Sequence, residues 1–359
     1  MSSSVNPFAP TSGIIAESWT SFTSSSPVYC FAICPVSLWL QFSHQLSHDS
    51  TPDIGVLSAP VARPVKLVRG ITSHESDVNV ISNVGDNYWL YGLYICPDID
   101  TIIYGLSDLL DYEKGWGIKK DTFGFLRQME ILGEENWFRI GDRDAATHLI
   151  RTNMLKNGKN LSDITQWMCE RFAIETKVFP ITDNILETRI TSNGESLHLQ
   201  EFWVKHRGKG PIEGIEYIGA DKARPLPSAI NAIQDAELVI IAPGNPLTSI
   251  GPMINIKGIR KELSKNKRKV VAISPIIGDK AFSGPAAEYM KAAGIEVSAF
   301  GISQMYADVC SKIVIDTKDK AQTKKIESLD LKVYDTKIKM QNKVAEDALA
   351  SFILKQVKQ

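Results

Sequence analysis

Three short segments rich in acidic residues lie close together in the sequence. They are 83–87 (Asn-Val-Gly-Asp-Asn), 96–101 (Cys-Pro-Asp-Ile-Asp-Thr) and 138–144 (Phe-Arg-Ile-Gly-Asp-Arg-Asp). Each follows or joins an apolar stretch, so we expect the carboxylates where strands and helices end. Mg²⁺ prefers oxygen ligands, and guanidinium groups bind phosphate oxygens. The three segments therefore predict a site that holds magnesium and a polyphosphate.

Two of these segments leave alternatives open. Asp98 and Asp100 flank a single isoleucine, and in an extended turn both carboxylates would lie on one side, where a metal or a hydroxyl could bind. Capping of the helix expected over 101–110 is the alternative. The segment 141–144 suits either the site or a helix N-cap with an internal ion pair. His148 follows Asp144 by four residues, and we expect it to be a structural hydrogen-bonding partner.

Two loops in the C-terminal part of the chain also suit an anion. Each follows an apolar run, at 237–242 and 269–274, and precedes an expected helix. Their small and polar residues are Gly244, Asn245, Ser249 and Gly251 in the first loop, and Ser274, Ser283 and Gly284 in the second. Backbone N–H groups and hydroxyls in such loops can bind phosphate. Turn formation explains either loop alone; two such loops after consecutive strands favour nucleotide or phosphate contact.

Short β-branched runs alternate with amphipathic segments, which predicts an α/β fold with a Rossmann-like, doubly wound, mostly parallel sheet. Expected strands are 77–84, 177–180, 186–191, 196–204, 215–219, 237–242, 269–274, 295–299, 312–316 and 331–334. Expected helices include 101–110, 122–132, 145–156, 161–172 and 342–358, the second capped by Asp121. We expect residues 54–100 and 221–359 to form the core, and 101–220 to form a smaller inserted α+β lobe that contributes to the site.

Composition excludes several classes of protein. In the 359 residues, 40 Lys and Arg balance 41 Asp and Glu, which argues against a nucleic-acid-binding protein. Five cysteines without a Cys-x-x-Cys pair argue against a disulfide framework or a zinc site and favour the cytoplasm. Residues 1–62 contain no Lys or Arg; we expect 1–53 to be a disordered or non-native extension, with a docking segment as the alternative. The apolar run 27–42 is short for a membrane span, so we expect no membrane association.

A series of short motifs follows in a set order from about residue 56 to the C-terminus. They are Asn-Val-Gly-Asp at 83–86, Pro-Asp-Ile-Asp-Thr at 97–101, Trp-Gly-Ile at 116–118, Asp-Thr-Phe at 121–123, Gly-Asp-Arg-Asp at 141–144, Gln-Glu-Phe-Trp at 200–203, Ser-Ile-Gly-Pro at 249–252, Ser-Pro-Ile-Ile-Gly at 274–278 and Ser-Gly-Pro-Ala at 283–286. In this order they resemble the 2-phospho-L-lactate transferase family of coenzyme F-420 biosynthesis. The ordered set is far more specific than any single loop.

The resemblance implies an enzyme that moves a 2-phospholactyl or enolpyruvyl phosphate group. The donor would be a lactyl or enolpyruvyl diphosphoguanosine, the acceptor the ribityl hydroxyl of the deazaflavin FO, and the released product GMP, with Mg²⁺ as cofactor. The implied catalytic residues are Asp86, Asp98 and Asp100. Asp100 and Arg139 would contact FO, and Asp86 and Asp98 would hold the metal or a hydroxyl. Lys66 and the two small-residue loops would hold the guanosine diphosphate. A homodimer is the general expectation for the oligomeric state.

The first loop departs from the family pattern. The family has a Gly-Gly-x-Gly type loop there, whereas this chain has Ala-Pro-Val-Ala-Arg-Pro at 59–64. Proline removes N–H donors, and Cβ atoms block a close approach of phosphate. A related non-enzymatic nucleotide-sugar-binding regulatory protein, or a pseudoenzyme with a degraded phosphate loop, therefore remains the alternative. A nicotinamide-dependent dehydrogenase is disfavoured, because no Gly-x-Gly-x-x-Gly motif is present.

Overall fold

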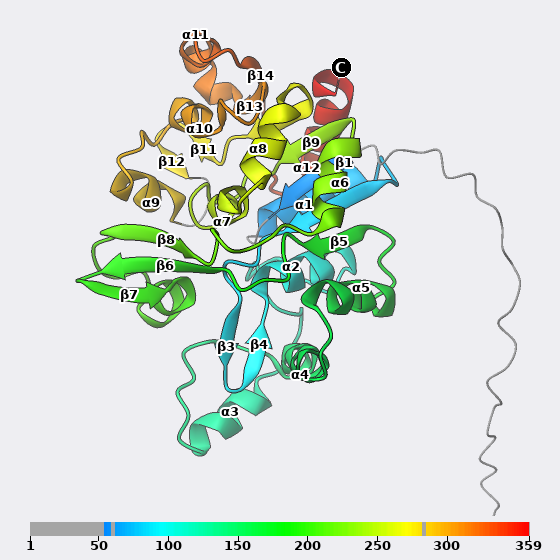
Figure 1. Ribbon diagram of the computed structural model, residues 1–359, viewed down its shortest axis with the longest axis vertical. Helices are drawn as coiled ribbons and strands as arrows, with labels where there is room; N and C mark the ends of the chain where they lie inside the picture. The colour runs from blue at the N-terminus through cyan, green and yellow to red at the C-terminus, as the bar shows by residue number, and fades with distance from the viewer. Residues whose placement is uncertain (1–53, 59–61, 282–284, 359) are drawn as a thin grey trace, which may run out of the picture. The chain divides into compact units, whose positions relative to one another are not determined.

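The computed structural model describes residues 54–58, 62–281 and 285–358. A seven-stranded sheet runs through this part of the chain in the order β14-β13-β10-β9-β1-β2-β5 (Figure 1). The strands are β1 (Ile54–Ser58), β2 (Val78–Ser82), β5 (Lys177–Pro180), β9 (Leu238–Ile241), β10 (Val270–Ile273), β13 (Lys312–Asp316) and β14 (Lys332–Thr336). Every pairing between them is parallel. The predicted α/β class and doubly wound parallel sheet are confirmed.

Helices cover both faces of this sheet. The helices α1 (Ala62–Thr72), α2 (Pro97–Leu106), α5 (Leu161–Arg171) and α12 (Lys343–Phe352) pack in sequence against one another, and α6 (Pro227–Asp235), α7 (Ile250–Asn255) and α8 (Ile259–Lys265) form a second packed group. Every residue of β1, β2, β9 and β10 is buried, as expected for strands covered on both sides. In β1, a Cβ at Gly55 would lie 2.8 Å from the carbonyl oxygen of Ala232, so glycine lets α6 approach the strand closely.

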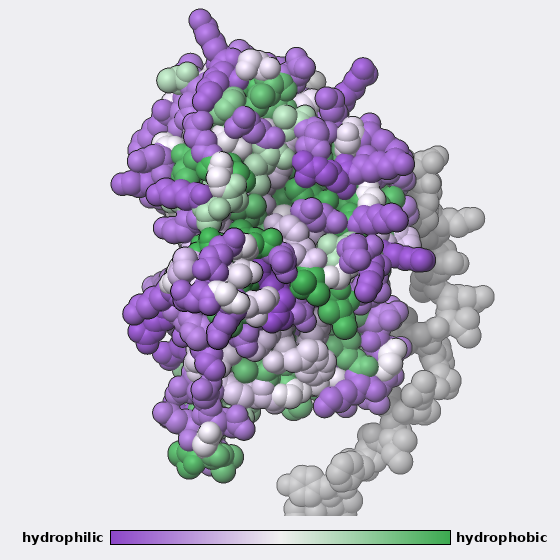
Figure 2. Space-filling model, turned by 60° about the vertical axis from the view of Figure 1, so that its left-hand side comes forward, coloured by the Kyte–Doolittle hydropathy of each residue, from purple (hydrophilic) through white to green (hydrophobic). Residues whose placement is uncertain are grey.

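Smaller elements surround one edge of the sheet. They are the hairpin of β3 (Tyr88–Leu90) and β4 (Leu93–Ile95), the helices α3 (Gly124–Ile131) and α4 (Asp142–Lys156), and an antiparallel sheet of β7 (Glu195–His198), β6 (Glu187–Ser192) and β8 (Gly214–Ile218). The face shown in Figure 2 is mostly hydrophilic, with hydrophobic side chains in its middle and at its lower tip. Ile131 and Leu132, at the end of α3, are exposed. None of the helices in the described ranges has the length and apolar character needed to cross a bilayer.

The structure differs from the sequence predictions at several boundaries. Strand β5 lies within 101–220 but pairs with β2 in the main sheet, and the expected boundary at 100/101 falls inside α2. The predicted strand at 295–299 is wrong: Ser298 there caps helix α10 (Ala299–Tyr306) by accepting a hydrogen bond from the backbone N–H of Gly301. Of the predicted strand 196–204, only 196–198 is extended, as the end of β7, and a π-helix follows at Glu201–Lys205. Short apolar runs do not distinguish strand from helix. The prediction for residues 1–53 lies outside the described residues.

Candidate functional site

The loops after β2 and β9 meet at the carboxyl edge of the sheet. From the central strand β1 the sheet extends to β2 on one side and to β9 on the other, which makes this edge a topological switch point, where open α/β sheets bind ligands. A cavity of about 490 Å³ opens here. Its lining includes five of the residues predicted from the sequence: Asp86, Asp100, Arg139, Asn245 and Ser249.

Two buried carboxylates face each other beside this cavity. Asp86 follows β2, and Asp98 lies in the first turn of α2. Asp98 is fully buried, and neither of its carboxylate oxygens has a hydrogen-bond partner among the described residues. Asp86 accepts a hydrogen bond from Nδ2 of Asn83 at 3.2 Å. Burial raises the pKa of Asp86 to about 7, and burial together with the Asp86 charge raises the pKa of Asp98 well above its usual value. Such a pair lacks a positive partner.

Asp98 and Asp100 do not lie on one side of an extended turn, as one interpretation of the sequence proposed. Pro97 begins α2, because its fixed φ suits the first helical position. Residues two apart in a helix point about 200° away from each other around the axis. Asp98 is therefore directed toward Asp86, whereas Asp100 is directed toward Arg151.

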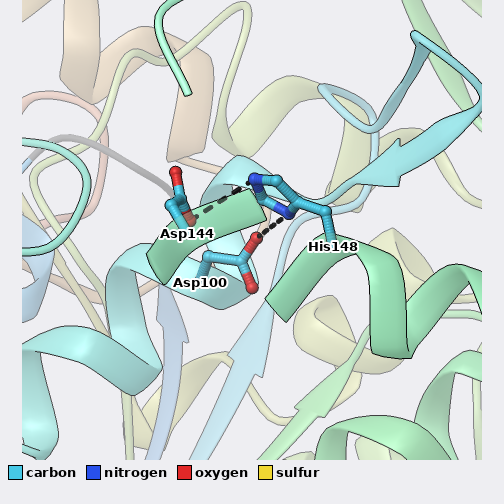
Figure 3. Close-up of side chains that lie close together, drawn as sticks. All are labelled: Asp100, Asp144 and His148. Carbon is cyan, nitrogen blue, oxygen red and sulfur yellow. Dashed lines mark ion pairs between the residues drawn. The ribbon is translucent and has the colours of Figure 1, made fainter. Parts of the chain in front are cut away.

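Asp100 belongs to a buried ion network. The guanidinium of Arg151 donates to both carboxylate oxygens of Asp100, from Nη1 at 3.0 Å and from Nη2. The His148 ring lies between two acids, with Nδ1 3.5 Å from Oδ2 of Asp100 and Nε2 3.3 Å from Oδ1 of Asp144 (Figure 3). The Tyr104 hydroxyl donates to Asp144 at 2.8 Å. Burial opposes ionisation of Asp144, but His148, Tyr104 and Arg151 outweigh it and lower its pKa.

The network contains a group of atoms spaced closely enough to hold a metal. Asp100, Asp144 and His148 offer ligand atoms within 4.8 Å of one another. The fully buried guanidinium of Arg151 already neutralises Asp100, and a cation there would lie against this fixed positive charge. Arg151 is thus paired inside the protein and not free to bind phosphate. His148 is a structural partner, as expected.

The segment 141–144 positions two helices by reciprocal capping. Asp142 accepts hydrogen bonds from the backbone N–H groups of Gly124 and Phe125 at the start of α3, and Asp121 accepts from those of Arg143 and Asp144 at the start of α4. Asp121 therefore caps α4 rather than the helix that follows it in sequence. A Cβ at Gly141 would lie 2.2 Å from Oδ2 of Asp121, so glycine is required for this approach.

We expect Asp121→Ala to lower the free energy of unfolding by about 1 kcal/mol, because two N–H groups of α4 lose their acceptor. Urea unfolding followed by circular dichroism measures this loss. Asp163→Ala is the control, because Asp163 also lies in the first turn of a helix but is exposed. Equal stabilities of the two variants would contradict a capping role for Asp121.

Aromatic side chains form one wall of the cavity. Trp116, Trp137, Phe138 and Trp203 line it, and Trp116 and Trp203 are 38% and 42% exposed. The guanidinium carbon of Arg139 lies 4.6 Å from the centre of the Phe123 ring, and Arg139 has no ion pair with any described carboxylate. Exposed aromatic faces can stack a flat ring, and an arginine without a carboxylate partner can bind an anion.

The remaining predicted residues lie at different places. Gly244 is between Pro243 and Asn245, which both line the cavity. Gly251 has a packing role, since a Cβ there would lie 2.2 Å from the Tyr217 hydroxyl. The Ser274 hydroxyl is engaged in a local turn, donating to the carbonyl of Ile276 at 3.0 Å. Ser283 and Gly284, like residues 59–61 of the first loop, lie outside the described residues.

Lys66 lies away from the cavity. Its amine donates to the carbonyl oxygen of Met340 at 3.0 Å and lies 3.9 Å from a carboxylate oxygen of Glu346. It lines a second cavity of about 320 Å³, which also includes Arg69 and Tyr112. The family resemblance placed Lys66 with the guanosine diphosphate, but α1 carries it toward α12.

Several residues at the cavity had no site role in the sequence prediction. They are Thr101, Tyr104, Thr248 and Tyr289, together with Gln200, which was recognised only as part of a motif. Gln200 donates from Nε2 to the backbone carbonyl of Asp86 at 3.4 Å. Tyr289 lies 203 positions from Asp86 in the sequence, by the difference of the two residue numbers. No local spacing relates residues so far apart, so only the fold brings them together.

Comparison with known proteins identifies the family. Residues 64–353 match the model of the 2-phospho-L-lactate transferase CofD family. The chain belongs to this family. It is 38% identical over 305 residues to the 2-phospho-L-lactate transferase of Methanocaldococcus jannaschii, which covers 82% of this chain and 97% of the relative. It is 39% identical over 258 residues to that of Methanosarcina mazei, covering 71% and 84%. The family is one of transferases, so the predicted enzyme class is confirmed.

Two further comparisons give another sequence relative and a structural neighbour. The phosphoenolpyruvate transferase of Mycolicibacterium smegmatis is 37% identical over 244 residues, covering 66% of this chain and 74% of the relative. A solved structure from Bacillus halodurans, a member of the UPF0052 family, matches with a TM-score of 0.58 at 13% identity, covering 85% of this chain and 99% of that chain. At this identity the structural match supports the fold alone.

Proposed function

We propose that this CofD family member transfers a 2-phospholactyl or enolpyruvyl phosphate group from a diphosphoguanosine donor to the ribityl hydroxyl of FO and releases GMP. The observation that carries the proposal is the buried Asp86–Asp98 pair at the switch point, next to a cavity with an aromatic wall. The names of the relatives supply the substrate class: phospholactate in the archaeal proteins and phosphoenolpyruvate in the mycobacterial one.

The Asp86–Asp98 pair suits Mg²⁺. Three carboxylate oxygens, counting both of Asp98 and one of Asp86, accept no hydrogen bond from the described residues. Mg²⁺ takes one or two carboxylates from a protein and completes its shell with water and phosphate oxygens. When bound there, it would neutralise charge on the phosphate oxygens of the donor. Asp86 and Asp98 would hold it, whereas the Asp100 carboxylate is already paired with Arg151.

The donor fits the side of the cavity formed by the loop after β9. Asn245 accepts hydrogen bonds on Oδ1 from the backbone N–H groups of Leu247 and Thr248, which fixes the loop that lines the cavity. The hydroxyl of Ser58, at the end of β1, is buried and has no hydrogen-bond partner among the described residues. These groups surround the switch point, where a nucleotide diphosphate binds in sheets of this kind.

The acceptor fits the opposite, aromatic side. A deazaflavin ring is flat and apolar, and Trp116 or Trp203 offers it a partly exposed ring face. Arg139 lies among these aromatics and would bind a polar edge of the ring system. Asp100 also lines the cavity, so it would accept a hydrogen bond from FO while its ion pair with Arg151 holds it in place. We assign it no proton transfer.

In the reaction, the ribityl hydroxyl oxygen attacks the phosphorus that carries the organic acid. A new P–O bond forms to FO, the P–O bond to the GMP phosphate breaks, and GMP leaves with the bonding electrons. The hydroxyl proton passes to solvent water, because Asp86 and Asp98 are both assigned to the metal. Positioning and charge neutralisation supply most of the acceleration in phosphoryl transfer.

The test is incubation of the full chain with FO, Mg²⁺ and lactyl or enolpyruvyl diphosphoguanosine, with mass detection of the phosphodiester product and of GMP. Formation of both products supports the proposal, and the faster donor identifies the organic acid. Binding of guanine nucleotide without any product would overturn the proposal and favour the regulatory or pseudoenzyme alternative.

We expect Trp116→Ala to raise the KM for FO about 10-fold or more, because stacking on an aromatic ring contributes about 1–3 kcal/mol. The KM for the donor should change little. Trp89→Ala is the control, since Trp89 is 52% exposed but does not line the cavity. Steady-state kinetics with each substrate varied in turn measures both constants, and an unchanged KM for FO would exclude Trp116 from the acceptor site.

A further inference from the structure

Tyr289 is a buried tyrosine at the cavity with no role in the site described so far. It lies in helix α9 (Ala286–Ala292) and is 1% exposed. Its ring packs against Phe202, with the ring centres 6.5 Å apart, in a small apolar cluster with Ile190 and Leu199. Leu247, from the loop after β9, packs against the same cluster. Tyr289 is therefore on the side of the cavity that carries the loop assigned to the donor.

The hydroxyl of Tyr289 has no hydrogen-bond partner among the described residues, although the residue lines the cavity. Leaving a buried hydroxyl without a partner is unfavourable, so such groups are rare unless a ligand satisfies them. Burial raises the pKa of this phenol, and the nearby charge of Asp86 raises it further. The hydroxyl therefore keeps its proton and is available as a donor.

We propose that the Tyr289 hydroxyl donates a hydrogen bond to a non-bridging phosphate oxygen of the diphosphoguanosine donor. The inference rests on the proposed function and adds a donor-binding residue to it. Phosphate oxygens accept hydrogen bonds, and an uncharged donor suits a site beside the Asp86 and Asp98 carboxylates. The neighbouring Tyr217 is not equivalent, because its hydroxyl already donates to the carbonyl oxygen of Leu247 at 2.6 Å.

The test compares Tyr289→Phe with the wild type by isothermal titration calorimetry with GDP in the presence of Mg²⁺, and separately with FO. A hydrogen bond to a charged group contributes enough that its loss weakens GDP binding about 10- to 100-fold. Affinity for FO should not change, and the midpoint of thermal unfolding should stay the same or rise, because an unpartnered hydroxyl is removed.

Tyr334→Phe is the matched control. The hydroxyl of Tyr334 is also buried without a described partner, but it lies in β14 at the far edge of the sheet and does not line the cavity. Its GDP affinity should equal that of the wild type. The inference is overturned if Tyr289→Phe binds GDP as tightly as the wild type, or if only its FO binding is weakened. In that case the proposed function still stands as long as the wild type forms product. A wild type that binds no GDP overturns both.

Discussion

Replacing Asp98 with asparagine should stabilise the metal-free protein and abolish most of its magnesium-dependent activity. The substitution removes one of two ionisable groups that are buried together without a positive partner. Relief of that burial should add about 1–3 kcal/mol to the free energy of unfolding. Loss of a metal ligand should lower kcat/KM at least about 100-fold, because metal stabilisation of the transition state amounts to several kcal/mol.

The gain in stability should depend on pH in a defined direction. The pKa values of Asp86 and Asp98 are higher in the folded chain than in the unfolded chain, where carboxyls ionise near pH 4. Above that pH the unfolded chain loses these protons first, so the folded protein loses stability as the pH rises toward about 7. Removing Asp98 removes part of this loss, and the advantage of Asp98→Asn should be larger at pH 8 than at pH 5.

Thermal and urea unfolding in EDTA, at both pH values, measure the effect on stability. Asp144→Asn is the control for a buried carboxylate that does have partners, Tyr104 and His148, and it should lower stability. Mg²⁺ should raise the midpoint of thermal unfolding of the wild type and have little effect on Asp98→Asn. A metal-free Asp98→Asn protein that is less stable than the wild type would show that Asp98 has a structural partner rather than a ligand role.

Sequence patterns predicted most of the strands of the main sheet. Strands such as β5 and β13 were predicted with the boundaries observed, because short β-branched runs between turns are distinctive. The short run at 295–299 was predicted as a strand, but Ser298 within it is the N-cap of helix α10. Strand β5 lies within the range predicted for the inserted lobe and pairs with β2 of the main sheet, because backbone hydrogen bonds decide which sheet a strand joins.

Residue types indicated the candidate site, but the pairing of charges could not be predicted. Asp86, Asp98, Asp100, Arg139 and Arg151 are all suited to bind phosphate or metal when considered alone. Because both residues lie in helix α2, Asp98 and Asp100 point in different directions, and only Asp100 pairs with Arg151. A hydrogen bond between residues 51 positions apart, such as that between Asp100 and Arg151, leaves no local pattern in a single sequence.

Arg151→Met should be the most destabilising single substitution at the site, lowering the free energy of unfolding by about 3–5 kcal/mol. Methionine fills a similar volume, so the loss comes mainly from leaving the Asp100 carboxylate buried without its counter-ion. The control is Arg260→Met, which removes a guanidinium that also donates two hydrogen bonds to one carboxylate, that of Asp308. That pair is about half exposed, at 45% and 50%, and should contribute less than about 1 kcal/mol.

A double variant separates the ion pair from simple packing. If the loss in Arg151→Met comes from an unpaired charge, then Asp100→Leu combined with Arg151→Met should be more stable than Arg151→Met alone, because the orphaned carboxylate is gone. If the loss came from packing around Arg151, the second substitution would lower stability further. Urea unfolding of the four proteins of this cycle distinguishes the two results. Restored stability without FO binding would assign Asp100 both roles, holding Arg151 within the fold and contacting the acceptor at the cavity.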